Sequence, residues 1–331
     1  MNVTIKDIAR ELGVSYSSVS RALNGKKGVS KRTIETVLEA AERMGYQPNE
    51  LARGLVNKIS NSVGVIIPDI NNPYFGEMVK GILAAAKENK YNVFLCTTDW
   101  NAETEREYYS TLMQKRVDGV IVKPAGIDST IQCNISSTPI IVIDPIEDSG
   151  CHSMVSVDNV QGGYLATKHL LDSGCEDIAF ILGKEDRLTC RLRLEGAERA
   201  LAEKGKSMNP DLIVEGSFSI EGGKEAAEIL FSKGGNVDAI FGMNDLIALG
   251  ILQLCTEQGR RIPEDISVIG YDNISYAGLP QIQLTTVHQP KYELGQLLFE
   301  TLLEEIQKGK ETDKVERKLQ PEIIRRKTTK G

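Results

Sequence analysis

The 331-residue sequence lacks the features of several large classes of protein. It has no apolar run approaching the roughly 18 residues of a membrane span, and its first residues contain no apolar secretion signal. Its six cysteines form no Cys-x-x-Cys pair, and its three histidines show no metal-ligand spacing. No G-x-G-x-x-G motif follows a predicted strand, and the segment around Lys206 lacks a glycine of a phosphate-binding loop. We therefore expect a cytoplasmic protein with no membrane, metal or cofactor.

Charge is distributed unevenly along the chain. The net charge of -7 argues at first against a nucleic-acid partner, because phosphate binding needs Lys and Arg. However, residues 1–60 carry ten Lys and Arg against six Asp and Glu, whereas the remaining residues carry 29 against 40. A basic N-terminal segment followed by an acidic body is typical of a small nucleic-acid-binding module joined to a larger domain.

Three short helices are predicted in the basic segment. Thr4 and Asp7 form a capping box for the first helix, which ends at Gly13. Ser15 is a suitable cap for the second helix, and Ser30 for the third. The residues expected to be buried are Ile5, Ile8, Ala9 and Leu12 in the first helix, Val19, Ala22 and Leu23 in the second, and Ile34, Val37, Leu38, Ala41 and Met44 in the third.

The second helix keeps a polar face made of Tyr16, Ser17, Ser20 and Arg21. In a helix-turn-helix protein this face enters the major groove of DNA. The helical pattern alone fits a generic three-helix bundle with a solvated face equally well.

Pro48 opens a further predicted helix, from Asn49 to Asn57. A helix of this length is unstable alone, so we expect it to fold against a partner. Leu55 on this helix suits a wedge in the minor groove, although a plain linker is the simpler interpretation of the segment by itself.

The N-terminal segment resembles the DNA-binding headpiece of the LacI/GalR repressor family. The matching residues read TIKDIARELGVSYSSVSRALNGKKGVSKRTIETVLEAAERMGYQPNELARGL, with Ile8, Leu12 and Ser18 as conservative departures from the family pattern. The resemblance implies a repressor in which Tyr16 and Arg21 read bases and Leu55 opens a central step of the operator. The DNA-binding set that it implies is Thr4, Ser15, Tyr16, Ser17, Ser20, Arg21, Asn24 and Leu55.

The acidic body alternates short apolar runs with amphipathic helical stretches. Two such stretches are Glu77 to Glu88 and Arg191 to Glu203. This alternation predicts α/β architecture, with parallel sheets covered by helices and a ligand at the carboxyl ends of the strands. The resemblance continues to about Arg326 and implies a bilobed periplasmic-binding-protein-like body, with the chain crossing between lobes near Asp158, Gln289 and Pro321.

These observations lead to the following expected domains. Residues 1–47 form the all-α helix-turn-helix domain, residues 48–60 a hinge helix and linker, and residues 61–331 the effector-binding and dimerisation domain. The first lobe comprises about 61–158 and 290–321, and the second about 159–289 with 322–331.

Polar and aromatic residues gather where the predicted strands end. Sugars present hydroxyl pairs to carboxylates, amides and guanidinium groups, and their C–H faces lie on aromatic rings. The resemblance implies an effector site of Tyr74, Phe75, Asp144, Arg187, Arg193, Phe218, Asn244, Asp272 and Gln289. Asn244 has a simpler interpretation as a helix cap, and Phe218 as a core residue. Asp144, Arg193 and Asp272 favour a shared polar ligand, because unpaired charges are costly to bury.

An enzyme is not expected. A glycosidase needs two carboxylates such as Asp144 and Asp272, but we expect an adjacent arginine to keep both ionised rather than raise one pKa for proton donation.

Two other kinds of effector remain open within the family. Purine- or nucleoside-responsive repressors share matches at Tyr74, Arg187, Thr189, Phe218 and Asp272, but a Trp stands in that subfamily where this chain has Pro145, and the subfamily has no Asn at the position of Asn244. In catabolite-control members a phosphocarrier protein is the corepressor, and nothing in the sequence excludes this.

The expected assembly is a homodimer on a palindromic operator. The C-terminal residues KTTKG are too short and polar to continue a heptad helix that would join two dimers. Because a two-fold symmetric dimer imposes its symmetry on its site, we expect an inverted repeat in double-stranded DNA.

Overall fold

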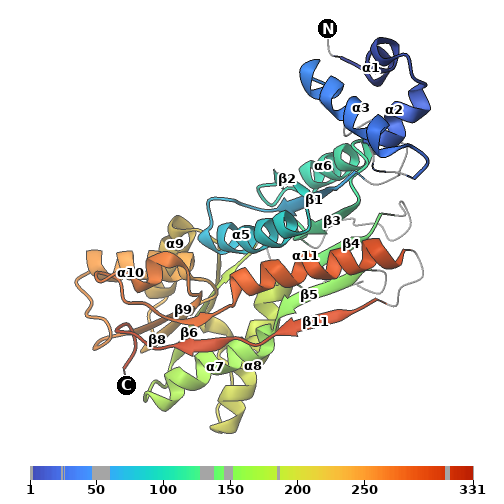
Figure 1. The fold of residues 1–331 in the computed structure, drawn as a ribbon. Helices are drawn as coiled ribbons and strands as arrows, with labels where there is room; N and C mark the ends of the chain where they lie inside the picture. Colours follow the sequence, from blue (N-terminus) through green and yellow to red (C-terminus); the bar gives the residue numbers. More distant parts are fainter. Residues whose placement is uncertain are drawn as a thin grey trace. The chain divides into compact units, whose positions relative to one another are not determined.

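The computed structural model describes residues 3–23, 25, 27–46, 60–126, 138–144, 152–184, 187–309 and 314–330, with only the backbone of Arg187. The chain divides into two units, Met1–Ser60 and Asn61–Gly331, and each is treated by itself. The smaller unit is all-α and the larger one contains two sheets (Figure 1). The predicted fold class is confirmed.

The small unit contains α1 (Ile5–Leu12), α2 (Tyr16–Leu23) and α3 (Lys31–Arg43). The capping box at the start of α1 is present, with the backbone N–H and hydroxyl of Thr4 donating to Asp7 Oδ2 at 3.0 and 2.6 Å. The backbone N–H of Ser18 donates to Ser15 Oγ at 3.1 Å, and that of Thr33 to Ser30 Oγ at 3.2 Å. The predicted caps therefore begin all three helices.

One prediction for the core of the small unit is wrong. Leu38 is 50% exposed, whereas Ala40, which the prediction omitted, is 1% exposed. The buried stripe of α3 follows Val37, Ala40 and Ala41, and Leu38 lies about 100° around the helix from Val37. The small size of Ala40 and Ala41 lets α3 pack closely on the other two helices.

The first sheet of the large unit has the order β11-β5-β4-β3-β1-β2, with parallel pairing throughout. Its strands are β1 (Ser62–Ile67), β2 (Asn92–Thr97), β3 (Gly119–Val122), β4 (Ile140–Ile143), β5 (Ser153–Val157) and β11 (Glu316–Leu319). With α5 (Pro73–Glu88), α6 (Ala102–Gln114) and α11 (Lys291–Lys308), it forms the part that we call the first lobe.

The second sheet has the order β12-β10-β9-β8-β6-β7, in which only the β10–β12 pair is antiparallel. Its strands are β6 (Ile178–Gly183), β7 (Ile213–Gly216), β8 (Ala239–Gly242), β9 (Ser267–Asp272), β10 (Thr285–His288) and β12 (Glu322–Ile324). With α7 (Asn159–Asp172), α8 (Arg187–Glu203), α9 (Ile220–Ser232), α10 (Asp245–Glu257) and the short helices η1 (Pro210–Leu212) and η2 (Ser275–Gly278), it forms the second lobe. The chain passes between the sheets after β5, after β10 and between β11 and β12.

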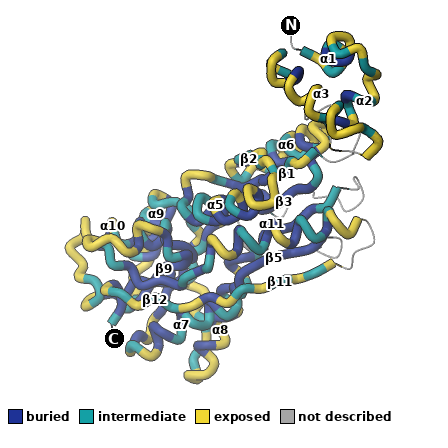
Figure 2. The backbone as a smooth tube through the Cα atoms, in the orientation of Figure 1, coloured by how far each residue is buried: buried dark blue, intermediate teal, exposed yellow. Residues whose placement is uncertain are grey.

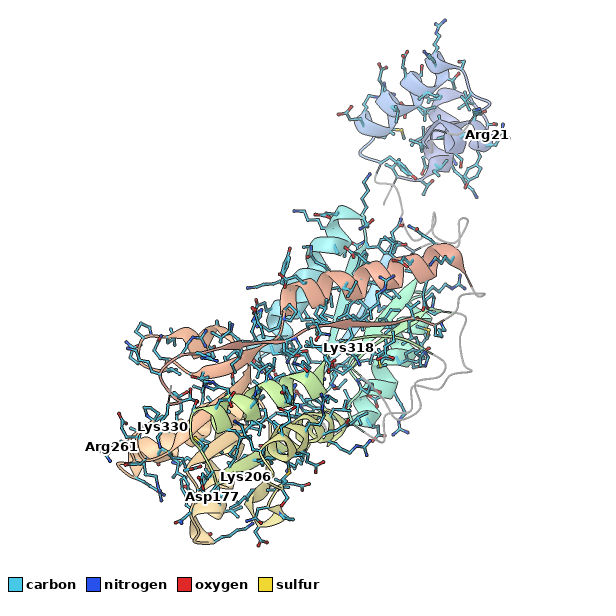
Figure 3. All side chains as sticks on the ribbon, turned by 90° about the horizontal axis from the view of Figure 1, so that it is seen from below. Arg21, Asp177, Lys206, Arg261, Lys318 and Lys330 are labelled. Carbon is cyan, nitrogen blue, oxygen red and sulfur yellow. The ribbon has the colours of Figure 1, made fainter. Side chains whose placement is uncertain are left out.

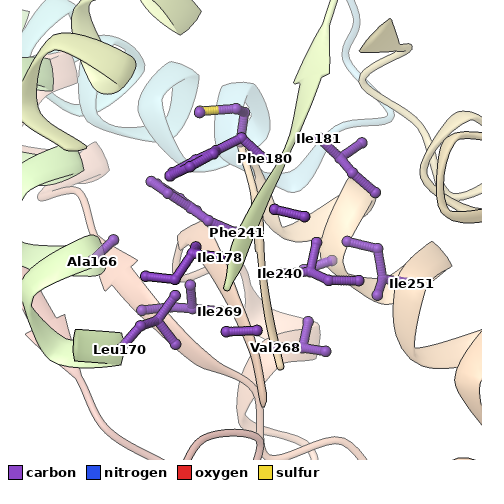
Figure 4. Packing of buried hydrophobic residues seen from close by; sticks show 14 of the residues in the cluster. Ala166, Leu170, Ile178, Phe180, Ile181, Ile240, Phe241, Ile251, Val268 and Ile269 are labelled. Atoms are coloured by element: carbon purple, nitrogen blue, oxygen red, sulfur yellow. The ribbon is translucent and has the colours of Figure 1, made fainter. Parts of the chain in front are cut away.

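Each lobe has its own apolar core, and the central strands are buried (Figure 2). In the second lobe Phe180 and Phe241 meet edge to face at 6.1 Å between ring centroids (Figure 4). Phe241 also stacks on Tyr271 at 6.4 Å. This aromatic column links the core of the second lobe to the end of β9, where Asp272 lies.

Closely packed helix pairs cover the sheets, and α5 and α11 lie side by side (Figure 1). A Cβ at Gly163 of α7 would lie 1.9 Å from the carbonyl oxygen of Arg193, and one at Gly196 of α8 would lie 1.9 Å from that of Val160. Only glycine permits this separation between the backbones, which positions Arg193 against α7. Gly81 and Gly295 permit the same close approach between α5 and α11, and Gly223 and Gly250 permit it between α9 and α10.

Candidate functional site

The small unit presents hydroxyl and guanidinium groups from α2. Tyr16 is 55% exposed, and Ser17 and Arg21 are also exposed, whereas Ser20 is half-buried. Ser15 Oγ lies 2.8 Å from Ser17 Oγ and 2.9 Å from Ser18 Oγ. Arg21 lies at the surface of the unit (Figure 3). These groups can form hydrogen bonds with base edges or phosphates without rearrangement of the core.

The structure places the remaining residues of the predicted DNA-binding set as follows. Thr4 is exposed at the start of α1, where Asp7 fixes its hydroxyl. Asn24 and Leu55 lie outside the described residues.

A cavity of about 40 Å³ lies at the carboxyl ends of the strands of the two lobes. The cavity is lined by Asn72, Tyr74, Phe75, Trp100, Lys123, Asp144, Thr189, Arg193, Phe218, Asn244, Asp272 and Gln289. Eight of the nine residues predicted for the effector site are thus brought together, and the side chain of the ninth, Arg187, is outside the described part of the chain.

The first lobe contributes an ion pair that the sequence analysis missed. Lys123 Nζ lies 3.1 Å from Asp144 Oδ2, and both side chains are buried. Lys123 follows β3 and Asp144 follows β4, and these strands are parallel neighbours. The rule that found Asp144, a polar residue directly after a buried strand, could also have found Lys123.

The second lobe contributes Arg193 from α8. Its Nε donates to Asn159 Oδ1 at 2.9 Å, and its Nη1 donates to the carbonyl oxygen of Met243. The guanidinium lies over the ring of Tyr271, 3.6 Å from the centroid. The predicted helix from Arg191 begins instead at Arg187, so Thr189 and Arg193 are one turn apart on the same helix.

Asp272 is held by hydrogen bonds from two residues that follow β10. Gln289 Nε2 donates to Asp272 Oδ1 at 2.6 Å, and Lys291 Nζ donates to the carbonyl oxygen of Asp272 at 2.7 Å. Burial raises the pKa of Asp272 to about 6, more than Arg193 lowers it. The pKa of Asp272 is therefore higher than that of an ordinary carboxyl, because the loss of solvation is the larger effect, but a carboxyl with this pKa is still mostly ionised at neutral pH.

Asn244 caps α10. Its Oδ1 accepts a hydrogen bond from the backbone N–H of Ile247 at 2.8 Å. The simpler interpretation of this residue is therefore confirmed. The cap uses only the amide oxygen, and the amide NH2 group supplies two further donors at a residue that lines the cavity.

Aromatic rings from both lobes form one wall of the cavity. Trp100 stacks on Phe218 with 6.0 Å between centroids and 25° between planes. Phe75 meets Trp100 edge to face at 6.4 Å and Tyr74 at 5.0 Å. Phe218 is half-buried and lines the cavity, although it also packs on the core of the second lobe. Trp100 was absent from the predicted set.

Backbone strain is concentrated near the cavity. Positive φ angles are found at Asp99 (49°), Trp100 (60°), Asp144 (62°), Asp272 (110°) and Asn273 (53°). Non-glycine residues rarely adopt this region, and such strain persists where the surrounding structure imposes it. Three of these residues, Trp100, Asp144 and Asp272, line the cavity, so its surroundings fix the backbone there.

Among the described residues, no group of three or more His, Cys, Asp and Glu has the arrangement of a metal site. No described helix combines the length and apolar character needed to cross a membrane.

Comparisons with known proteins match both the small unit and the large unit to one family. Residues 4–49 match the family described as bacterial regulatory proteins, lacI family, and residues 60–324 match periplasmic binding proteins and sugar binding domain of LacI family. The chain is 36% identical over 330 residues to the HTH-type transcriptional repressor PurR of Photobacterium profundum, covering 99% of this chain and 98% of that one. PurR of Pasteurella multocida is 36% identical over 332 residues, with 99% of each chain covered.

Solved structures give the same result. The lac repressor dimer bound to operator and the anti-inducer ONPF matches with a TM-score of 0.88, 28% identity and full coverage of both chains. The regulator CelR in complex with cellobiose matches with a TM-score of 0.75 and 27% identity, covering 99% of this chain and 100% of that chain. A ribose-bound regulator from Enterococcus faecium matches with a TM-score of 0.72 and 31% identity over 81% of this chain and 98% of that one. The chain therefore belongs to the LacI family of bacterial regulators and is a DNA-binding transcriptional repressor with a small-molecule effector domain.

Proposed function

We propose that this repressor binds an inverted-repeat operator as a homodimer and that a sugar or sugar derivative in the cavity controls its binding. The main support is the convergence of Asp144, Arg193 and Asp272 on one cavity with a stacked aromatic wall. Carboxylates and a guanidinium form charge-assisted hydrogen bonds with hydroxyl groups, and aromatic rings cover the apolar face of a sugar ring.

The DNA-reading part of the proposal rests on the exposed face of α2. Arg21 is assigned to a guanine, whose N7 and O6 it can bind together, while Tyr16 and Ser17 contact neighbouring base edges. Thr4, Ser15, Ser20 and Asn24 contact the backbone or support these residues, and Leu55 from each subunit enters the centre of the operator. Domain boundaries at about residues 47 and 60 separate this module from the effector domain.

Control of DNA binding requires that the effector favour one arrangement of the lobes. Asp144 and Phe75 reach the cavity from the first lobe, whereas Arg193, Phe218 and Asp272 reach it from the second. A ligand that contacts both groups favours a closed cleft, and it shifts the equilibrium by its difference in affinity for the two states.

A purine or nucleoside is the second candidate effector. The PurR relatives favour it, as do Tyr74, Thr189, Phe218 and Asp272, which all line the cavity. Asn244 and Pro145 are the departures that favour a sugar, and Pro145 lies outside the described residues. A phosphocarrier corepressor is a third candidate on family resemblance alone.

A thermal-shift screen of the full-length protein tests these candidates. The ligands are sugars, sugar phosphates, nucleosides and purines, each applied with and without operator DNA. A ligand at 100 times its dissociation constant adds roughly 2.7 kcal/mol to the free energy of unfolding. Stabilisation by a sugar supports the proposal, whereas stabilisation by guanine or hypoxanthine alone replaces it with the purine candidate.

A further inference from the structure

Lys291 is a buried cation at the point where the chain returns from the second lobe to the first. It is the first residue of α11 and follows Gln289 and Pro290 of the crossover after β10. Its side chain is only 1% exposed. A lysine is rarely buried so completely unless its ammonium group is paired and hydrogen-bonded. The contacts of this ammonium group are therefore expected to hold neighbouring elements in place.

The ammonium group of Lys291 donates to backbone carbonyl groups outside its own helix. Its Nζ lies 2.7 Å from the carbonyl oxygen of Asp272 and 3.0 Å from that of Asn273, at the end of β9. It also lies 3.3 Å from the carbonyl oxygen of Gln289 in the crossover. The three N–H donors of an ammonium group match these three acceptors. A helix of the first lobe thus holds the backbone of the second lobe that carries the Asp272 carboxylate.

The backbone that Lys291 holds is strained. The φ angle is 110° at Asp272 and 53° at Asn273, a region that non-glycine residues rarely adopt. Within the second lobe, the backbone N–H of Asn273 donates to Thr286 Oγ1 at 3.3 Å. Strain of this kind persists only where the surrounding contacts impose it. Loss of the Lys291 contacts should therefore let this turn relax and move the Asp272 carboxylate, which lines the cavity.

Glu77 of α5 supplies an opposite charge from the first lobe. Its Oε2 lies 3.4 Å from Lys291 Nζ, and its side chain is 45% exposed. Helices α5 and α11 lie side by side (Figure 1), and a Cβ at Gly81 of α5 would lie 2.0 Å from the carbonyl oxygen of Tyr292, the residue after Lys291. Because the two backbones are in such close contact, Glu77 and Lys291 move together as parts of the first lobe.

We infer that Lys291 is a positioning residue that couples the effector site to the first lobe. It fixes the turn that carries Asp272 and, through Glu77, links that turn to α5. A displacement of the Asp272 backbone on effector binding is thereby transmitted to the first lobe. The inference rests on the proposed control of DNA binding by an effector, and it holds for a sugar and for a purine alike.

The test uses the full-length protein, with D-ribose, cellobiose, hypoxanthine and guanine as probes. Calorimetry measures the affinity of each probe, and gel shifts measure operator affinity with and without a probe that binds. The variants are Lys291→Met, Glu77→Gln and Glu293→Gln. Glu293 is a matched control for Glu77, because it is exposed on α11 and does not line the cavity.

Lys291→Met removes the donors that hold the turn, so the affinity of the bound probe should fall by on the order of 10-fold or more. Glu77→Gln keeps these donors, and Glu77 does not line the cavity, so probe affinity should stay within about threefold of the wild type. The change in operator affinity that the probe causes should nevertheless shrink by about threefold or more in Glu77→Gln, because the link to α5 is lost. Glu293→Gln should match the wild type in both measurements. A variant that is merely less stable would lose probe affinity and response together.

Trp100 provides a readout that needs no probe. It is the only tryptophan of the chain and stacks on Phe218 of the second lobe. Acrylamide quenching of its emission should rise in Lys291→Met and in Glu77→Gln, because the lobes are held together less firmly. Quenching in Glu293→Gln should equal that of the wild type.

Wild-type probe affinity in Lys291→Met overturns the positioning role, and a wild-type response in Glu77→Gln overturns the coupling. A probe that binds the wild type without changing its operator affinity contradicts the proposed effector control instead, and the quenching of Trp100 then decides on Lys291. The quenching also decides if no probe binds, since equal values for the wild type, Lys291→Met and Glu77→Gln reject the inference. If Lys291→Met does not fold, Glu77→Gln, which alters a half-exposed side chain, decides by the same criteria.

Discussion

The α2 face and the cavity place their polar groups in opposite environments. Tyr16, Ser17 and Arg21 are exposed and come from one short helix. The polar groups of the cavity, such as Asp144, Arg193 and Asp272, are buried and come from widely separated segments. Exposed groups on α2 impose little desolvation on the free protein, so their contribution arises when DNA binds. Buried charges lose their solvation when the protein folds, before any ligand arrives. Hydrogen bonds and ion pairs with internal partners such as Lys123 and Gln289 offset part of this desolvation energy.

Because the α2 face is exposed and the cavity is buried, substitutions in the two regions should have different effects on stability. Substitution of an exposed residue on α2 should change recognition and leave stability almost unaltered. Substitution of a buried residue in the cavity should change ligand binding and stability together, because the same contacts serve both.

The largest expected effect is at Arg193. Arg193→Ala leaves Asn159 and the Met243 carbonyl without their donor and removes the cation that most lowers the pKa of Asp272, so effector affinity should fall by on the order of 100-fold or more. Asp272→Ala should have a similar effect. Operator binding without effector should survive in both variants. Calorimetry with the effector and gel shifts with the operator measure the two properties.

Arg191→Ala is the matched control, because Arg191 is exposed on the same helix and does not line the cavity. Unchanged effector affinity in both Arg193→Ala and Asp272→Ala would mean that the ligand binds elsewhere.

A smaller effect is expected at Arg21. Arg21→Ala should reduce discrimination at one symmetric pair of operator positions by about 1–3 kcal/mol, with little change in the melting temperature of the protein. Binding to a set of single-base operator variants, compared with Arg43→Ala on the exposed end of α3, measures this. A uniform loss of affinity for every variant would make Arg21 a phosphate contact.

The pH dependence of stability should be dominated by two buried carboxyls of the second lobe, Asp245 and Asp272. Burial raises the pKa of Asp245 from an ordinary 3.8 to about 8, and the carboxyl accepts from Thr286 Oγ1 at 2.6 Å and from Ile274 N–H at 2.8 Å. The folded state therefore binds more protons than the unfolded state between these pH values. The contribution of Asp245 to the free energy of unfolding is fully present below pH 3.8 and is lost as the pH rises through about 8. Asp272 acts in the same direction up to about pH 6.

Asp245→Asn removes the larger of these titrations. The melting temperature of the variant, measured by calorimetry across this pH range, should fall less steeply with rising pH than that of the wild type. Glu257→Gln, at an exposed carboxyl of α10, is the control. Equal slopes for the wild type and Asp245→Asn would show that Asp245 is ionised in the folded protein at neutral pH.

The smallest effect concerns a helix cap of the small unit. Ser30→Ala removes the acceptor for Thr33 N–H and should lower the stability of this unit by about 1 kcal/mol. Thr36→Ala, within the same helix, should be almost neutral, because its hydroxyl only bonds back to the Arg32 carbonyl. A loss at Thr36 as large as that at Ser30 would contradict the capping argument. Circular dichroism melts of the two variants make the comparison.

The features that the sequence predicted correctly are those that depend on residues close together in the chain or on a general rule for parallel sheets. Helix caps at Thr4, Ser15 and Ser30 depend on residues three apart, so local pattern was sufficient to find them. Asp144 and Asp272 follow buried strands, and the α/β rule places such positions at one edge of a sheet. Their grouping with Arg193 came from the family resemblance rather than from periodicity.

Other features depend on contacts that no local pattern contains. Lys123 directly follows a buried strand, as Asp144 does, so the same rule points to it, but its burial follows from the ion pair with Asp144 rather than from the sequence. The glycines that let α7 approach α8 resemble ordinary glycines until both helices are placed. Leu38 was assigned to the core because it stands at helical spacing from Ile34 and Ala41, whereas the position of α3 on its neighbours decides which side is buried.

Trp100 offers the most direct test of the sugar-binding cavity. It is the only tryptophan in the chain, and it stacks on Phe218 of the opposite lobe at the wall of the cavity. Its fluorescence should therefore report ligand entry directly. Titration of the full-length protein with the sugar found by thermal shift should give a saturable change in emission that is lost in Arg193→Ala and kept in Arg191→Ala. A saturable change with hypoxanthine or guanine and none with any sugar would contradict the account.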